Sequence, residues 1–584
     1  MGGEPQLARR LPAWLAAAGV ALALGFTLHQ AVQVRLHYYD SFDYMNDARR
    51  LNGDESAAYY RVHAPLVPVL ARPIVSAIVD AEDAGDPVRW ILPHLLGWAM
   101  AALALLAAWL WMRERAGAGW ALLGVLLLCS TRLFIRYAPF LLVDIATAGW
   151  VALAFFAWAR ATSARGEPRH WLLFGLAVAG GMLTKYSLGA LPFALIAAEL
   201  VRIPLERRLR LRRIAGALAA GVVAAIVFWL FLAAVFREVD GEPFTLEAFQ
   251  ALIGGASAMV EPMPGETQWD YGPMLLATVS PITVALALVG VPVGLRRDWR
   301  RDLPALLWML GFTALISFRV GHNEARYLWP ALPALAYFAM IGARWLYALV
   351  WSRLRARRLL PVVGASIVAL ATWPAFVQAR RDTHPFFYAD TQPDFLRFIQ
   401  EETRPPRRAF WTGHFVALTP PSPNEGLVQD EFMDFFHLSH PPVHLFTDAQ
   451  MIGVATHAPA DYLRRQEGAG DVLVVGPPGF VFAYADQSGQ LDPPATFDVW
   501  SRRRAVLRRA GDAYVDDSGE AWFLWRDGAL VATRAWGEVD LTLESGPLPR
   551  RSIAEGERVA LPAAPRELEA VSVRRRTFPA SWSR

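Results

Sequence analysis

The chain has 584 residues, of which 54% are hydrophobic and only 19% are charged, and its mean hydropathy is +0.27. Soluble proteins average about 25% charged and 45–50% apolar residues, so this composition excludes an ordinary soluble enzyme and a disordered protein. The single cysteine, Cys129, excludes an internal disulfide framework and a multi-thiolate metal site. The formal net charge of +4 averages over loops on two sides of a membrane and says little.

Apolar segments of about twenty residues recur along the first two thirds of the chain, and this length crosses a hydrocarbon core about 30 Å thick. The pattern predicts eleven membrane spans. These are 12–34, 90–112, 118–131, 139–158, 170–184, 186–201, 214–236, 273–295, 303–318, 328–350 and 359–377. The first is long and leads into many others, so we interpret it as a retained helix rather than a cleaved signal peptide.

Arginine-rich connections alternate with connections of mixed charge. The arginine-rich set comprises 9–10, 113–115, 160–169, 202–213, 296–301 and 353–358. Short arginine-rich loops stay in the cytoplasm, so we expect a cytoplasmic N-terminus and an extracytoplasmic location for everything after residue 377. The expected localisation is the bacterial cytoplasmic (inner) membrane.

The expected fold is an α-helical polytopic membrane domain, 1–377, followed by a C-terminal extracytoplasmic mixed α/β domain, 378–584. The second domain has an ordinary globular composition and is large enough to form its own core. Between spans, segment 237–272 is expected to be loop-like, and the tail beyond about residue 545, rich in Pro, Arg and Glu, to be weakly ordered.

Three segments carry the α/β prediction for the C-terminal domain. Residues 393–402 have the pattern of a helix, and 460–479 that of a helix, a turn and a buried strand. Residues 519–536 predict strands joined by a turn at Asp527–Gly528.

Ionisable residues are nearly absent from the interiors of the predicted spans and gather at their outer ends. Transporters keep such residues within their spans, because they are costly in lipid and are retained for function. The predicted topology brings acids and bases to one depth near the outer surface, which favours a cavity there over a path through the membrane. The residues at these ends are Asp40, Asp43, Asp144, Lys185, Glu324 and Arg326.

Asp40 directly follows the first span, in a segment that also carries Asp43. An acid at this depth can act as a general base toward an incoming hydroxyl or amine; the alternative is a solvated acid or a helix cap. A helical turn would place both acids on one face, where close carboxylates acquire different pKa values. The alternative is that both acids are simply exposed to solvent at the surface.

Histidine and arginine follow in the same outer segment, as His63 and Arg61. The imidazole can contact a phosphate or a metal, or it can be a hydrogen-bonded interfacial histidine. Asp144 lies within an apolar run and needs a cationic partner, and a structural pair with Arg136 or with another arginine is the simplest interpretation.

Lys185 is the only lysine among 57 basic residues. Snorkelling to the interface would explain a cation here, but an arginine would serve equally well. A compact ammonium suits a phosphate, so we expect a functional role. Arg326 can clamp a phosphate through two parallel hydrogen bonds, or it can pair with Glu324.

Four parts of the chain, taken in order, resemble the GT-C class of glycosyltransferases. They are Asp40 to Tyr44 with 48–53 and 63–68, then 136–156, 175–192 and 325–339. Within that class the pattern is similar to the superfamily of protein O-mannosyltransferases and lipid A aminoarabinose transferases, which is related to glycosyltransferase family 39. The resemblance covers about residues 12–350.

The resemblance implies a sugar donor linked to a polyprenyl phosphate and a lipid, glycan or protein acceptor on the outer face, with no nucleic acid involved. It implies that Asp40 is the catalytic acid or base and that Lys185, Arg136 and Arg326 hold the lipid phosphate. Many relatives have a Glu directly after the acid, whereas this chain has Ser41, and Asp43 is the candidate substitute.

The sequence shows no required cofactor. Some relatives bind a divalent cation near the first outer loop, so the resemblance allows one here. The sequence shows no complete set of ligands, and no residue is assigned to a metal site.

Three hypotheses follow. The leading one is an inverting membrane glycosyltransferase that uses a polyprenyl-phosphate sugar. The second is a polytopic transporter or flippase for lipid or polysaccharide, which predicts polar residues at mid-membrane and often a repeat. The third is a non-catalytic cell-envelope assembly protein.

Overall fold

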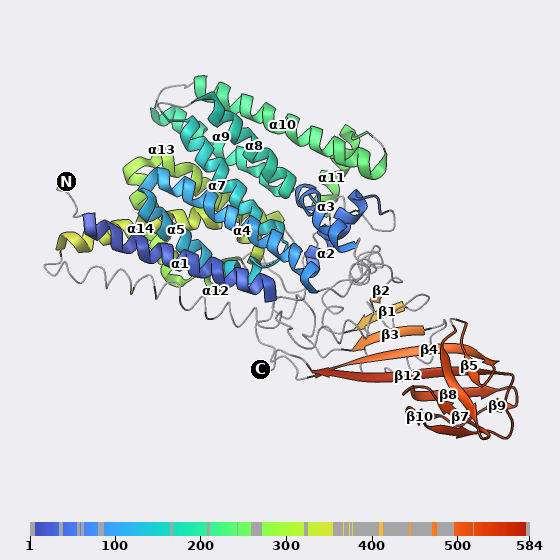
Figure 1. Ribbon diagram of the computed structural model, residues 1–584. Coiled ribbons are helices and arrows are strands. Elements are labelled where there is room, and N and C mark those ends of the chain that lie inside the picture. The colour runs from blue at the N-terminus through green and yellow to red at the C-terminus, as the bar shows by residue number, and fades with distance from the viewer. Residues whose placement is uncertain are drawn as a thin grey trace. The chain divides into compact units, whose positions relative to one another are not determined.

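The computed structural model describes most of the membrane domain and much of the C-terminal sheet. The described residues are 6–33, 39–54, 59, 63–79, 87–163, 167–206, 211–241, 243–258, 271–319, 325–353, 366, 369, 373, 377, 408–412, 443–445, 470–475, 496–517 and 519–579. Contacts divide the chain into two units, 1–78 with 88–384 and 79–87 with 385–584. The described elements of the first unit are helices and those of the second are strands (Figure 1).

The first unit consists of α-helices and two short 3-10 helices. The first eight are α1 (Gln6–Gln33), α2 (Tyr39–Leu51), α3 (Leu66–Val79), α4 (Pro87–Ala116), α5 (Ala118–Cys129), α6 (Arg132–Tyr137), α7 (Val143–Ala161) and α8 (Pro168–Thr184). The others are η1 (Tyr186–Ala190), α9 (Leu191–Glu206), α10 (Leu211–Asp240), α11 (Leu246–Ala258), α12 (Tyr271–Thr278), α13 (Pro281–Arg319), η2 (Ala325–Leu328) and α14 (Leu332–Arg353).

Helices occupy each of the first ten predicted spans, while span 359–377 lies almost entirely outside the described residues. Six described helices are long and apolar enough to cross a membrane. They lie within α1, α4, α7, α10, α13 and α14. The protein is therefore a multi-pass membrane protein.

Two predicted spans, 273–295 and 303–318, fall largely on the two halves of α13. The arginine-rich connection between them continues the helix instead of forming a loop, but Asp298 has a non-helical backbone (φ −159°, ψ 70°) that breaks it. Pro304 follows within one helical turn of the arginines, where its missing N–H weakens the ladder. The break at Asp298 lies within 296–301, the connection that the sequence predicts between the two spans.

Glycines allow close backbone contacts at two places in the helical unit. A Cβ at Gly97 of α4 would collide with the carbonyl of Phe140, just before α7. The same holds between α13 and α14, where a Cβ at Gly290 would meet the carbonyl of Phe338. Small residues let membrane helices approach closely and gain dispersion energy, so α4 and the segment before α7 are fixed against each other.

The prediction of a loop over 237–272 is wrong for part of the segment. Helix α10 continues to Asp240, and α11 covers Leu246–Ala258. Phe244 and Leu252 are buried in a cluster with Phe228, Leu232 and Phe236 of α10. This apolar contact, which the prolines in the segment obscure, holds α11 against α10.

The second unit contains a twelve-stranded sheet. Its strands are β1 (Arg408–Thr412), β2 (Val443–Leu445), β3 (Gly470–Val475), β4 (Thr496–Ala510), β5 (Ala513–Val515), β6 (Ala521–Arg526), β7 (Ala529–Ala532), β8 (Gly537–Leu543), β9 (Gly546–Pro547), β10 (Arg551–Ile553), β11 (Arg558–Ala560) and β12 (Glu567–Pro579). Strand β1 pairs in parallel with β2 and β3, and the other pairs are antiparallel, in the order β10-β8-β12-β4-β5-β6-β7-β11.

The sheet confirms the predicted strands at 470–475 and 521–532, including the turn at Asp527–Gly528. Both turn residues have positive φ, as a tight hairpin turn of this type requires. The predicted helices at 393–402 and at the start of 460–479 lie outside the described residues. Trp522 and Trp536 stack at 4.1 Å between ring centroids in the core of this unit.

The prediction of a weakly ordered tail beyond residue 545 is wrong. Strand β12 pairs with β4 along its whole length. Leu568, Ala570 and Ser572 are buried at every second position, which is the period of a strand. The glutamates beside them, Glu567 and Glu569, and the arginines at 574–576 give the tail its polar composition and hide this alternation.

The predicted orientation can be tested by cysteine labelling in intact cells. The native Cys129 is buried, so its background reaction is expected to be low. We expect a cysteine at Ala460 to react with an impermeant reagent, and a cysteine at the exposed Arg296 to react only after permeabilisation. Protection at position 460 would contradict the outside assignment.

Candidate functional site

The start of α2 is held against the segment that leads into α7. The Ser41 hydroxyl donates a hydrogen bond of 2.9 Å to the carbonyl of Leu141, and both groups are buried. Asp40 is the second residue of α2, and Asp144 is the second residue of α7. The side chain of Asp40 lies outside the described part, but its helix end and that of Asp144 are neighbours.

A histidine group, which we define as Asp43, Asp47 and His63, forms on one side of α2. Asp47 Oδ2 lies 3.2 Å from His63 Nδ1, and Asp43 Oδ2 lies 3.9 Å from His63 Nε2. The ring of Tyr44 lies 5.0 Å from the imidazole, between centroids. Both acids therefore face the same imidazole from successive turns of α2, and they hold its ring between them.

Burial controls the protonation of Asp47. The carboxyl is fully buried, and loss of hydration raises its pKa from 3.8 to about 6, although the hydrogen bond and the charge of His63 act in the opposite direction. Helix α2 is not one of the membrane-crossing helices. The carboxyl thus titrates in the same range as an ordinary imidazole.

The stability of the protein should report this titration. Because the pKa of Asp47 is higher in the folded than in the unfolded chain, its contribution to stability is present near pH 4 and is lost as the pH rises through about 6. In Asp47→Asn this contribution does not titrate. We expect the melting temperature of the parent, relative to Asp47→Asn, to fall between about pH 4 and pH 7 in detergent. Parallel curves for the two proteins would contradict the raised pKa.

A second cluster, the lysine group, consists of Asp144, Lys185 and Arg326. Lys185 Nζ donates a hydrogen bond of 2.5 Å to Asp144 Oδ1, and Arg326 Nη1 lies 3.9 Å from Asp144 Oδ2. The ammonium and the guanidinium also lie over one ring, that of Tyr327, at 4.3 and 5.4 Å from its centroid. Three helix ends, those of α7, α8 and η2, bring these charges together.

The members of the lysine group differ in exposure. The side chains of Asp144 and Arg326 are 3% and 5% exposed, whereas that of Lys185 is 28% exposed. An ammonium has three donors, and Asp144 takes one of them. Lys185 is therefore the cation of this group that can reach a ligand from outside.

The two groups are connected. Tyr186, the residue after Lys185, donates a hydrogen bond of 3.2 Å from its hydroxyl to the carbonyl of His63. The histidine group and the lysine group thus belong to one region of the helical unit, at the ends of α7 and α8 where α2 begins. The arrangement joins carboxylates, which can accept a proton, to cations, which can stabilise an anion.

The structure brings most of the sequence candidates into this region and selects among the alternatives for Asp144. Asp144 pairs with Lys185 and with Arg326, the second of the two possibilities that the sequence left open. Arg136 is buried in α6 and lies 4.7 Å from the ring centroid of Tyr137. Arg61 and Glu324 lie outside the described residues.

Sequence reasoning did not select Asp47 or Tyr327 as site residues. The four-residue spacing of Asp43 and Asp47 on a helix was a usable signal for the first. The position of Tyr327 directly after Arg326 was the only sign of the second. Among the described residues, no group of three or more His, Cys, Asp or Glu side chains is arranged to hold a metal ion.

Comparison with known proteins gives a family match and a fold match. A sequence model of the family described as dolichyl-phosphate-mannose-protein mannosyltransferase matches residues 64–233. No curated protein matches the chain by sequence. The matched residues include Asp144 and Lys185 but not α2.

Solved structures match over most of the chain. The crystal structure of ArnT from Cupriavidus metallidurans in the apo state has a TM-score of 0.54 and 15% identity, covering 79% of this chain and 92% of that one. The same protein bound to undecaprenyl phosphate has a TM-score of 0.52 and 16% identity, covering 78% and 92%. An oligosaccharyltransferase of Archaeoglobus fulgidus in the apo form has a TM-score of 0.52 and 10% identity, covering 94% and 75%.

Identities this low show a likeness of fold, and the family match adds a likeness of sequence over residues 64–233. Both agree with the resemblance found in four separate segments of the sequence. The helical unit has the GT-C fold, and the chain is similar to the membrane glycosyltransferases of the GT-C class.

Proposed function

We propose that the chain is a membrane glycosyltransferase that moves a sugar from a polyprenyl-phosphate-linked donor to an acceptor on the outer face of the cytoplasmic membrane. The observation that carries the proposal is the lysine group. It presents a partly exposed ammonium, supported by Asp144 and Arg326, at the end of a membrane-crossing helix. The acid-bearing start of α2 lies beside it.

The depth of the lysine group suits a lipid phosphate. Asp144 begins α7, whose 19 residues are apolar enough to cross a membrane, so the group lies near one surface of the bilayer. A polyprenyl chain would lie in the hydrocarbon with its phosphate at this surface. A charge-assisted hydrogen bond from Lys185 to a phosphate oxygen is among the strongest that a protein can make.

The matching structure that contains a bound lipid supports a donor linked to a polyprenyl phosphate. ArnT from Cupriavidus metallidurans was crystallised with undecaprenyl phosphate, and its fold matches 78% of this chain. A polyprenyl phosphate is the product that remains when such a donor has given up its sugar. The proposed donor for this chain is thus a lipid of the same chemical kind.

In the proposed reaction, a hydroxyl or amine of the acceptor attacks the anomeric carbon of the donor sugar. A new bond forms at that carbon as its bond to the phosphate oxygen breaks, so the configuration inverts. Asp40 accepts the proton of the attacking group. The electron pair of the broken bond stays on the phosphate, whose charge Lys185 and Arg326 stabilise without protonating it.

The histidine group has a positioning role in this scheme. Asp43 and Asp47 flank His63, and Asp40 lies one turn before Asp43 on the same helix. These contacts, with the hydrogen bond from Ser41 to Leu141, fix the direction of α2. The base is therefore held by a rigid helix end rather than by a mobile loop.

The transporter hypothesis is less well supported. It predicts ionisable residues near the middle of the membrane. Among the described residues, Lys185, Arg115 and Arg160 form their ion pairs at or near the ends of α8, α4 and α7. A non-catalytic scaffold would not need an ammonium held beside two other charged groups.

Analysis of the lipid that co-purifies with the protein tests the proposal. We expect extraction and mass spectrometry to identify a polyprenyl phosphate, with or without its sugar. Delipidated protein should then bind added undecaprenyl phosphate more tightly than undecaprenol, because the lysine group recognises the phosphate. Equal binding of the phosphate and the alcohol would contradict the proposal.

A further inference from the structure

A second charged region lies at the opposite end of the helical unit from the lysine group. Helix α7 connects the two, with Asp144 in its first turn and Thr162 as its C-cap. At 1.5 Å per residue these positions are about 27 Å apart along the helix, close to the thickness of a hydrocarbon core. The second region therefore lies at the other surface of the membrane.

This region contains a pocket of about 270 Å³ lined mainly by arginine and aromatic side chains. The ends of α4, α7, α9 and α10 and the break in α13 meet around it. Its arginines are Arg115, Arg202, Arg213, Arg300 and Arg301, and its acids are Glu114 and Asp298. We call it the arginine pocket.

Internal ion pairs neutralise part of this charge. Arg115 pairs with the fully buried Asp302 at 2.9 Å, and Glu199 accepts from Arg202 and lies 3.8 Å from Arg213. Glu114 pairs with a sixth arginine, Arg160, at 2.6 Å. Among the described residues of the pocket and these neighbours, six arginines face four acids, which gives this set a net positive charge.

The arginines at the break in α13 are the most accessible of the set. Arg300 and Arg301 are exposed, and the pair of Arg301 with Asp298 is long, at 3.7 Å. Arg213 lies deeper and donates a hydrogen bond of 2.8 Å to the carbonyl of Thr162. The pocket thus combines partly buried cations, Arg202 and Arg213, with the exposed cations Arg300 and Arg301.

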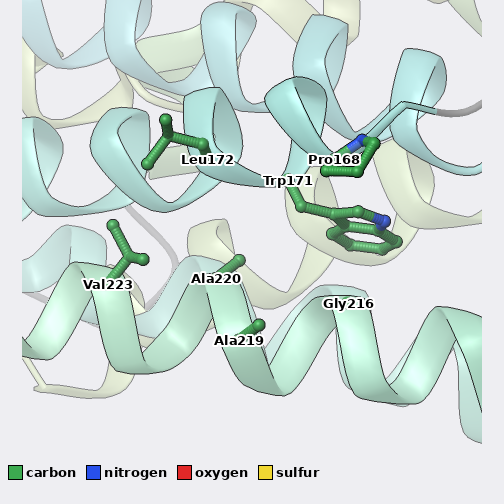
Figure 2. A pocket seen from close by; sticks show the side chains of 7 residues that line it. All are labelled: Pro168, Trp171, Leu172, Gly216, Ala219, Ala220 and Val223. Carbon is green, nitrogen blue, oxygen red and sulfur yellow. The ribbon is translucent and has the colours of Figure 1, made fainter.

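An apolar groove of about 340 Å³ lies next to the arginine pocket, between α8 and α10 (Figure 2). Figure 2 shows Trp171 and Leu172 of α8 on one side and Ala219, Ala220 and Val223 of α10 on the other. Gly216 lies at the Trp171 end, where a Cβ would collide with the indole.

The pocket and the groove are contiguous in structure. Trp158 lines the pocket and Trp171 lines the groove, and their rings meet edge to face at 5.4 Å between centroids. On α10, Arg213 of the pocket lies one turn before Gly216 of the groove. From there the groove continues along the helix to Val223, further into the membrane span.

We propose that this end of the helical unit binds the phosphate of a membrane lipid in the arginine pocket, with one acyl chain in the groove between α8 and α10. Guanidinium groups match phosphate oxygens in bidentate geometry, and basic pockets between membrane helices bind anionic lipid headgroups. A soluble phosphate ester has the same phosphate chemistry. The groove favours the lipid, because only a lipid fills an apolar surface that runs into the membrane.

Native mass spectrometry of the delipidated full-length protein tests the proposal. The probes are phosphatidylglycerol, phosphatidylcholine and soluble glycerol 3-phosphate. We expect phosphatidylglycerol to bind at least about fivefold more tightly than the other two. The double variant Arg300→Gln/Arg301→Gln should bind phosphatidylglycerol roughly tenfold or more weakly, since each interfacial arginine contributes about fivefold. Arg169→Gln, an exposed arginine outside the pocket, is the control and should change nothing.

A second pair of variants separates the lipid from a soluble ligand. Ala219 is exposed and lines the groove, whereas Ala225 is exposed on the same helix and does not line it. Ala219→Phe should weaken lipid binding and leave glycerol 3-phosphate unaffected, while Ala225→Phe should affect neither. Unchanged phosphatidylglycerol affinity in the double arginine variant would overturn the site. Equal affinity for glycerol 3-phosphate, with no effect of Ala219→Phe, would overturn the lipid as the ligand.

Discussion

Asp40→Asn is expected to lower turnover by roughly 10²–10⁴ while the protein stays folded. The substitution keeps the size of the side chain and removes its charge, so the proton of the attacking group has no acceptor. Asparagine is well tolerated near a helix start, and the contact from Ser41 to Leu141 that holds this end of α2 is unchanged. Initial rates with saturating donor and a melting curve in detergent measure the two effects separately.

Asp43→Asn is the matched control for this prediction. Asp43 is nearly buried and faces His63 at 3.9 Å, so its loss should loosen the histidine group and cost less than the loss of Asp40. A larger loss from Asp43→Asn would show that the two acids have exchanged roles. A scaffold without catalytic function would tolerate both substitutions.

Lys185→Ala is expected to weaken use of the donor by about ten- to a hundredfold, which corresponds to a charge-assisted contact of about 1.5–3 kcal/mol. Lys185→Arg should have a smaller effect in the same direction, because a wide guanidinium replaces a compact ammonium. The apparent KM for the donor should rise while that for the acceptor changes little. A titration of short-chain polyprenyl-phosphate sugar measures both values.

Two controls keep this prediction specific. Lys185 also neutralises Asp144, which is 3% exposed, so Lys185→Ala needs a melting curve to show that the fold is retained. Arg72→Ala removes a partly exposed cation that pairs with Glu238 outside the lysine group, and it should leave the donor KM unchanged. Donor use like that of the parent in Lys185→Ala would show that the lysine only balances the buried carboxylate.

The sequence predicts the helices well because the length of an apolar segment is set by the thickness of the membrane. It also predicts that Asp144, Lys185 and Arg326 lie at one depth, since each stands at a span end. It does not predict which of them touch. Lys185 and Asp144 are 41 residues apart, and their contact depends on how α7 and α8 are rotated about their axes, which hydropathy does not specify.

The remaining errors have a related cause. In α11 and in strand β12, composition suggested irregular structure, but burial of one face determines the fold. Phe244 and Leu252 beside α10, and Leu568 and Ala570 within the sheet, supply those faces. The partner of each lies elsewhere in the chain, so a local pattern of residues does not reveal it. For Asp47 the spacing from Asp43 was a usable signal, but its contact with His63, sixteen residues away, is visible only in the structure.

The central claim is that the lysine group and Asp40 together transfer a sugar from a lipid phosphate. The most direct measurement incubates the purified protein with a labelled polyprenyl-phosphate sugar and membrane acceptor and follows both products. The account predicts release of polyprenyl monophosphate in step with glycosylated acceptor, and loss of both in Asp40→Asn. A donor that stays intact, or that only crosses the bilayer of a vesicle without losing its sugar, would contradict it.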